Sequence, residues 1–230
     1  MILKYGQTSD DIKKIQAIFL MPQTGYFDKN LKLAVEHFQR RHFGYENDID
    51  GIIGNKAIAK LSEIVSKVSK SFISAGTQKI IDTLHPSVRF EAQCMVAEVN
   101  REYLTGVAKV ILTQGKRTFA EQDALYAQGR TKPGKVVTSA KGGQSIHNYG
   151  FALDIALLID GKAIWDEKKD FDKDAQADWM EVVHVFKKYA WNWGGDWVKF
   201  KDLPHFDKAD YGDWKKLSKM PKDDNEYVIL

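Results

Sequence analysis

His147 and Asp154 stand close together in the stretch SIHNYGFALDI, and their types and spacing could support chemistry. An imidazole and a carboxylate are ligands that zinc takes, and a catalytic zinc needs three protein groups together with an open position for water. The third group must come from another part of the chain, and His205 in the segment KDLPHF is our candidate. We therefore predict that these three residues gather around one metal ion.

The residues that follow Gly150 have the pattern of a short strand, which predicts where the carboxylate of Asp154 points. Successive side chains of a strand face opposite ways, so Ala152, Asp154 and Ala156 share one face. The bulky residues fall on the other face: Phe151, Leu153 and Ile155. A carboxylate between two small neighbours leaves room for a metal and a substrate, whereas an unpaired charge in a packed core would be costly.

Asp202 precedes His205 by three residues, and Pro204 between them argues against a helix. A bend at Leu203 and Pro204 would turn both side chains toward one point. The roles would then differ, with His205 as a ligand and Asp202 as the general base toward the attacking water.

The composition is that of an ordinary globular protein of one or two domains, with 230 residues, 43% hydrophobic and 28% charged. The single cysteine, Cys94, excludes an internal disulfide framework, and its helical context predicts a buried side chain. The beginning of the chain, MILKYGQTSDD, lacks the pattern of a signal peptide, and no apolar run has membrane-spanning length. We therefore expect a cytosolic protein. The net charge of +3 suits an anionic polymer such as a cell wall, and would suit other partners too.

Residues 1–66 have the periodicity of three short helices around one small core. A capping-box pattern at Thr8–Asp11 opens the first helix, the second begins near Asp28, and the third carries Ala57 and Leu61. Residues 67–79 are rich in serine and lysine and are interpreted as a linker. Residues 80–230 then form a second domain.

The second domain is predicted to begin with a helix opened by Pro86. A strand is predicted over 107–113. The helix after it begins at a capping box, Thr118–Glu121, and ends near Gly129. A glycine-rich loop leads to the strand over 151–159, which Asp160 and Gly161 join to a returning strand.

For several other residues the sequence predicts only a place in the fold. His37 and His42 are expected at the surface, His85 in a loop, and the polar tail after Trp214 loosely held. Arg117 lies at a strand-to-helix junction, where both a surface arginine and a functional one occur.

The stretch DFDKDAQADWME, residues 170–181, has acids at relative positions 1, 3, 5, 9 and 12, as calcium loops do. Relative position 6 is Ala175, where such a loop uses glycine for its turn. The alternative is an acidic N-terminus of the following helix, favoured by the helix dipole, and this is the interpretation we adopt. The sequence leaves open whether calcium binds here.

The N-terminal pattern resembles the peptidoglycan-binding domain with the three-helix fold. The resemblance rests mainly on core and turn residues: Gly6, Ile12, Ile15, Gln16, Gly25, Phe27, Ala34, Val35, Phe38, Gln39 and Asp50–Gly54. It implies that residues 1–66 hold the protein on its polymer without chemistry of their own.

The second domain resembles the zinc peptidases that cut peptidoglycan stem peptides, which include L-alanyl-D-glutamate endopeptidases and D-Ala-D-Ala carboxypeptidases. The motifs that carry the resemblance are GKRT at 115–118, EQ at 121–122, SIHNYG at 145–150, ALD at 152–154, GGDW at 194–197 and DLPHF at 202–206. It implies an α+β fold, with a small mainly antiparallel sheet flanked by helices. It further implies a role for each of these residues: zinc ligands His147, Asp154 and His205; catalytic residues Asp202 and Arg117; substrate-binding residues Ser145, Gln122 and Trp197.

Together the two domains resemble a phage endolysin, which would wait in the host cytoplasm until the membrane is permeabilised. Bacterial peptidoglycan is then the expected partner, with no nucleic acid, no stable membrane insertion and a monomeric state. Three functions stay open: an endopeptidase for the L-Ala-D-Glu bond, which we favour, a D-Ala-D-Ala carboxypeptidase, and a non-catalytic cell-wall-binding protein.

Overall fold

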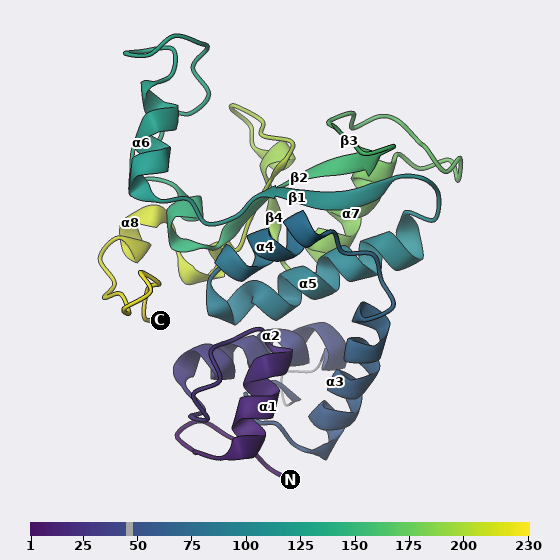
Figure 1. Ribbon diagram of the computed structural model, residues 1–230, viewed down its shortest axis with the longest axis vertical. Coiled ribbons are helices and arrows are strands. Elements are labelled where there is room, and N and C mark those ends of the chain that lie inside the picture. Colours follow the sequence, from purple (N-terminus) through teal and green to yellow (C-terminus); the bar gives the residue numbers. More distant parts are fainter. Residues whose placement is uncertain (45–47) are drawn as a thin grey trace.

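Three helices pack together at the N-terminal end of the computed structural model, which describes residues 1–44 and 48–230 (Figure 1). They are α1 (Asp10–Ile18), α2 (Lys29–Phe43) and α3 (Asn55–Val68). Apolar side chains three and four residues apart on these helices share a buried core, including Ile12, Leu31 and Leu61. The helices lie where the sequence predicted them, but Ser9 and not Thr8 caps α1, by accepting a hydrogen bond from the backbone N–H of Ile12.

The predicted linker over 67–79 is helical at both ends. Helix α3 continues to Val68, and α4 (Ala75–Thr83) begins after Ser74, whose side chain accepts a hydrogen bond from the backbone N–H of Thr77. Only a short connection therefore separates the two helices. One of the serines that indicated a linker, Ser74, is therefore the N-cap of α4.

Helices α4 and α5 lie between the N-terminal helices and the sheet (Figure 1). Pro86 begins a 3-10 turn, η2 (Pro86–Val88), which continues into α5 (Arg89–Glu98) and a π-helical turn, η3 (Val99–Tyr103). The rings of Phe19 and Phe90 stand 4.9 Å apart across the boundary, and Arg41 donates two hydrogen bonds to Glu98 at 3.0 and 3.1 Å. The N-terminal helices are thus packed directly onto the second part of the chain.

The sheet is antiparallel, as predicted, and β2 is its central strand. Its order is β1-β2-β5-β4, with β3 also paired to β2. The strands are β1 (Lys109–Gln114), β2 (Ala152–Ile159), β3 (Lys162–Ile164), β4 (Asn192–Trp193) and β5 (His205–Asp207). Asp160 and Gly161 make the tight turn between β2 and β3, both with positive φ (49° and 75°), as the hairpin motif predicted.

The remaining helices border the sheet. They are α6 (Phe119–Ala127), η4 (Ile146–Tyr149), α7 (Asp178–Lys188), η5 (Gly194–Asp196), η6 (Ala209–Tyr211) and α8 (Trp214–Leu217). The predicted capping box of α6 is present, with Thr118 and Glu121 as its two members. The segment that carries the GGDW motif follows β4 and forms η5. No helix within the described residues is long and apolar enough to cross a membrane.

Two histidines and the C-terminal tail are more buried than the sequence predicted. His37 is 5% exposed, and its Nε2 lies 2.9 Å from the Tyr211 hydroxyl. His85 is fully buried, and its Nε2 donates to the carbonyl of Val228 in the tail at 3.0 Å. The tail is therefore held against the domain, because that carbonyl completes a buried polar contact. Cys94 is buried, as predicted.

Candidate active site

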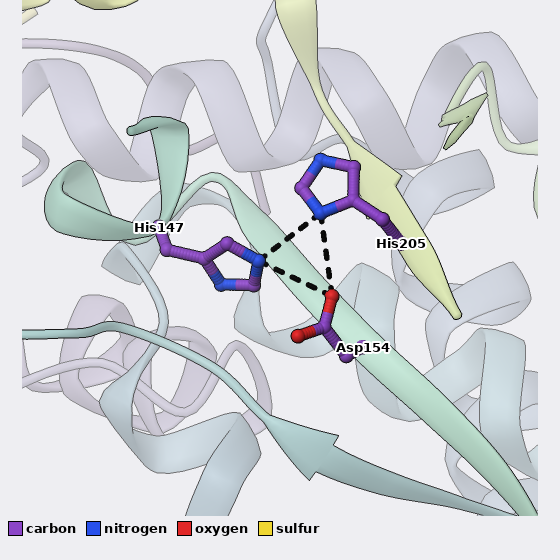
Figure 2. Close-up of side chains that lie close together, drawn as sticks. All are labelled: His147, Asp154 and His205. Carbon is purple, nitrogen blue, oxygen red and sulfur yellow. Dashed lines mark hydrogen bonds and ion pairs between the residues drawn. The ribbon is translucent and has the colours of Figure 1, made fainter. Parts of the chain in front are cut away.

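His147, Asp154 and His205 meet at one point although His205 is far from the other two in the sequence (Figure 2). The His147 Nε2 lies 3.1 Å from the His205 Nδ1 and 3.2 Å from the Asp154 Oδ1. The third side of the triangle, from the His205 Nδ1 to the Asp154 Oδ1, is 3.3 Å. The three residues that the sequence selected as a ligand set are thus brought together.

The sheet register places two members of this triangle. Asp154 on β2 and His205 on β5 are directly opposed across an antiparallel strand pair, so their side chains emerge side by side on one face. His147 comes from the short η4 turn, which ends at Gly150 with φ 78°. A side chain at Gly150 would put its Cβ 2.6 Å from the backbone nitrogen of His85, so only glycine allows this return of the chain.

The outer nitrogen of each imidazole is held by an acceptor. The His147 Nδ1 donates to the carbonyl of Gly115 at 2.8 Å, which leaves the lone pair of Nε2 facing the centre of the triangle. The His205 Nε2 lies 3.4 Å from a carboxylate oxygen of Asp207, which orients its Nδ1 toward the same centre. Asp207 is a functional residue that sequence reasoning missed, and its only signal was its place two residues after His205 on a strand.

The donor set fits a zinc ion. Zinc binds imidazole nitrogen and carboxylate oxygen at about 2.0–2.2 Å, so two ligands of a tetrahedral ion are separated by about 3.3 Å. The three sides of the triangle are 3.1, 3.2 and 3.3 Å. Three acceptors that face one another at this distance repel unless positive charge lies between them. The arrangement therefore suits a cation with three protein ligands.

The pKa values of Asp154 and His205 also indicate that positive charge is favoured at the centre of the triangle. Burial alone would raise the pKa of Asp154, but the two imidazoles hold it well below its ordinary value. Burial also lowers the pKa of His205, but hydrogen bonds and charges from Asp154 and Asp207 outweigh it and raise that pKa to about 9. The carboxylates thus bind positive charge strongly at this point.

Asp202 lies beside the triangle on the wall of the same pocket. The turn at Leu203 and Pro204 brings it there, with the backbone N–H of His205 donating to the carbonyl of Asp202 at 3.2 Å. Partial desolvation, and then the negative charge of Asp154, raise the pKa of Asp202 above its ordinary value. Gly194 permits this approach, since a Cβ there would lie 2.3 Å from the Asp202 carbonyl oxygen.

Arg117 also points into the pocket. Its Nη2 lies 3.8 Å from the Asp154 Oδ2, and its Nη1 donates to the Gln122 Oε1 at 2.7 Å. The buried Asn148 donates to the backbone carbonyl of Arg117 at 2.9 Å, which ties the arginine to the turn that carries His147. The geometry therefore favours the functional interpretation of Arg117 over that of a surface side chain.

The pocket has a volume of about 420 Å³ and is open enough for a peptide. Ser145 and Trp197 line it, as expected of residues that would contact a substrate, and the Trp197 ring lies 5.1 Å from that of His205. Gln122 does not line it. It is fully buried, because its amide bridges Arg117 and the carbonyl of Ala140. The expectation that Gln122 contacts substrate stays a prediction, and its hydrogen bond to Arg117 favours a positioning role.

Comparison with known proteins gives the chain a family. The peptidoglycan L-alanyl-D-glutamate endopeptidase CwlK of Bacillus subtilis (strain 168) is 46% identical over 125 residues, which are 54% of this chain and 72% of the relative. The peptidase M15 profile described as D-alanyl-D-alanine carboxypeptidase matches residues 138–208. The chain belongs to the M15 peptidase family. The matched residues of this M15 peptidase include every member of the His147, Asp154 and His205 triangle as well as Asp202.

One solved structure is also similar. The Serratia marcescens L-Ala D-Glu endopeptidase ChiX aligns with 60% of this M15 peptidase and 91% of its own chain, at 18% identity and a TM-score of 0.41.

Proposed function

We propose that this protein is a zinc-dependent peptidase that hydrolyses the L-Ala-D-Glu amide bond of peptidoglycan stem peptides. The observation that carries the proposal is the triangle of His147, Asp154 and His205 on the wall of an open pocket, with Asp202 and Arg117 beside it. The choice of bond is supported by the relative CwlK, which is named as an L-alanyl-D-glutamate endopeptidase.

The reaction divides among residues of the pocket. Zinc held by the triangle would polarise the scissile carbonyl and lower the pKa of a water molecule toward about 7. Asp202, with its raised pKa, takes a proton from the attacking water and returns one to the leaving amine. Arg117 donates hydrogen bonds to the oxygen of the carbonyl as negative charge develops on it.

The experiment compares the wild type with Asp202→Asn on purified peptidoglycan, while the zinc content of both proteins is measured. We expect Asp202→Asn to keep one zinc per chain and to lose about 10²- to 10⁴-fold in the release of new amino groups. Undiminished hydrolysis by Asp202→Asn would contradict the proposal, and so would full activity of a zinc-free protein. Asp82→Asn, a change in an exposed carboxylate of α4, serves as the control and should leave both quantities unchanged.

A D-Ala-D-Ala carboxypeptidase is the second candidate, because the family that matches residues 138–208 carries that description. The two activities use the same chemistry on different bonds, so the products distinguish them. A non-catalytic cell-wall-binding protein, the third candidate, is disfavoured because the pocket retains both Asp202 and Arg117.

We further propose that helices α1–α3 bind the cell wall and that the protein acts as a phage endolysin. The support is the motif pattern of residues 1–66 and their packing as one helical unit. Because Phe19 and Arg41 cover α5, deletion of this unit would expose apolar surface, so binding is better tested in the full chain. Full-length His147→Ala should sediment with purified walls whose stem peptides have been removed. Loss of sedimentation with such walls would contradict a wall-binding role of α1–α3.

A further inference from the structure

The loop over residues 170–181 gathers five acidic side chains at the beginning of α7, away from the catalytic pocket. One oxygen from each of Asp170, Asp172 and Asp178 lies within 4.8 Å of the others. The same is true of a second set, Asp172, Asp174 and Glu181. Asp172 belongs to both sets, so the five residues form one continuous cluster of carboxylates.

Several of these carboxylate oxygens are buried and have no partner among the described residues. They are the Asp172 Oδ1, the Asp178 Oδ2 and the Glu181 Oε2. Asp178 is fully buried and Glu181 is 4% exposed, yet neither forms an ion pair with a lysine or arginine of the described chain. A buried carboxylate oxygen without a donor is costly, so these atoms indicate that a positive ligand belongs at this point.

In Asp172 and Asp178 the second carboxylate oxygen is fixed by hydrogen bonds, which sets the direction of the unpaired one. The Asp178 Oδ1 accepts from the backbone N–H of Phe171 at 2.8 Å. The Asp172 Oδ2 accepts from the backbone N–H and the hydroxyl of Thr105, at 3.2 and 3.0 Å. The carboxylates are therefore held in place by the protein before any ligand arrives.

The backbone of the loop turns at Ala175 although calcium loops usually have glycine at this position. Ala175 stands at relative position 6, and its φ is 76°, in the left-handed region that glycine usually supplies for a calcium loop. Its backbone N–H donates to the Asp170 Oδ2 at 2.9 Å, which closes the turn around the cluster. Ala175 thus adopts a strained left-handed backbone conformation at the position where the loop must turn.

We propose that the loop Asp170–Glu181 binds one calcium ion. Calcium takes six to eight oxygen ligands at 2.3–2.6 Å, and the carboxylate oxygens of each set lie within 4.8 Å of one another, close enough for one ion to contact all three. The site offers only oxygen, whereas the triangle around His147 offers two nitrogens and one oxygen. The two sites therefore select different metals by the chemistry of their donors.

Calcium at this loop would stabilise one side of a small pocket that Asp202 also lines. Trp179, between Asp178 and Glu181 in the chain, is buried and lines a small pocket together with Asp202 and Leu203. A cation that holds the first turn of α7 would thus also fix the indole beside Asp202. The proposed site does not depend on the proposed catalytic activity, since it uses none of the same ligands.

The experiment measures binding of calcium to the full-length protein in chelator-treated buffer with zinc held at one equivalent. Isothermal titration should show one Ca²⁺ per chain. The Tm should rise by about 5 °C or more at a hundredfold excess over the Kd, and Mg²⁺ should produce a smaller rise because it demands a tighter octahedral site. No heat of binding and no shift in Tm up to about 5 mM Ca²⁺ would overturn the proposal.

Two conservative variants separate a calcium site from a merely structural loop. Glu181→Gln and Asp178→Asn keep the shape of each side chain and should abolish the calcium-dependent rise in Tm. Glu181→Gln should also keep or raise the Tm without calcium, because it removes a charge that repels its neighbours. His147→Ala, which alters the zinc triangle, should leave calcium binding unchanged. A rise in Tm that persists in both loop variants would overturn the assignment of the ion to this loop.

Discussion

The Nη1 of Arg117 donates a 2.7 Å hydrogen bond to the Oε1 of Gln122, and the Nε2 of the same glutamine donates to the carbonyl of Ala140 at 2.8 Å. Gln122 is fully buried, so this bridge is shielded from water. The guanidinium therefore reaches the catalytic pocket from a fixed direction, which is the condition for a preorganised oxyanion donor. We therefore expect Gln122 to act as a positioning residue, through its hydrogen bond to Arg117.

Replacement of Gln122 by leucine should lower kcat by about tenfold to a hundredfold, while the KM changes less. The physical reason is that Arg117 loses its buried partner and no longer points reliably at the developing oxyanion. The measurement is steady-state hydrolysis of purified stem peptides, together with the zinc content of each protein.

Gln122→Glu provides the matched control for this prediction. A carboxylate at this position still accepts from Arg117 but cannot donate to the Ala140 carbonyl, so activity should recover in part. Equal losses in the leucine and glutamate variants would indicate a packing defect and would contradict the positioning role.

Asp207 should set the affinity of the catalytic centre for zinc, because its carboxylate holds the outer nitrogen of His205 at 3.4 Å. We expect Asp207→Asn to weaken zinc binding by about tenfold to a hundredfold, measured by competition with a chelator at pH 7. Asp210→Asn, a change in a partly exposed carboxylate, should leave the affinity unaltered. An unchanged affinity in Asp207→Asn would show that the carboxylate does not support the ligand.

The contribution of Glu181 to the stability of the calcium-free protein should fall as the pH rises from about 4.5 to about 7. Burial, and then the four neighbouring aspartates, raise the pKa of Glu181 from its ordinary 4.5 to about 7 in the folded protein. Between these values the folded chain binds more protons than the unfolded chain, so the stabilisation present at low pH is lost as the pH rises. The difference in Tm between the wild type and Glu181→Gln, followed across this range, isolates the contribution. A difference that does not change with pH would contradict the assignment.

Ala175→Gly should stabilise the calcium-free protein by about 0.5–1 kcal/mol. A left-handed residue with a side chain costs roughly 1–2 kcal/mol, and the greater freedom of glycine in the unfolded chain offsets part of the gain. Denaturant unfolding with zinc present and calcium removed measures this change. Ala177→Gly is the control, because Ala177 has an ordinary φ of −74° and the same substitution should not stabilise there.

The strongest local patterns predicted the fold well. Hydrophobic periodicity placed α1–α3, a capping box placed α6, and the Asp160-Gly161 pair placed the β2–β3 turn. The alternation along β2 also predicted correctly that Asp154 faces the site. These features depend on neighbouring residues, so a short stretch of sequence contains the information that decides them.

Features that depend on tertiary contact were not predictable in the same way. His85 and the tail carbonyl of Val228 meet only because the chain folds back, and no periodicity indicates it. Gln122 belongs to a recognised motif, but its burial depends on Arg117 and the distant Ala140. The left-handed turn at Ala175 was unexpected because local propensity disfavours it, and the surrounding hydrogen bonds impose it.

Mass spectrometry of purified peptidoglycan digested by the zinc-loaded protein tests the central claim most directly. We predict fragments that end in the free carboxylate of L-Ala and others that begin with the free amine of D-Glu, and Asp202→Asn should form both about 10²- to 10⁴-fold more slowly. Release of terminal D-Ala without these fragments, or formation of the fragments by Asp202→Asn at the wild-type rate, would contradict the account.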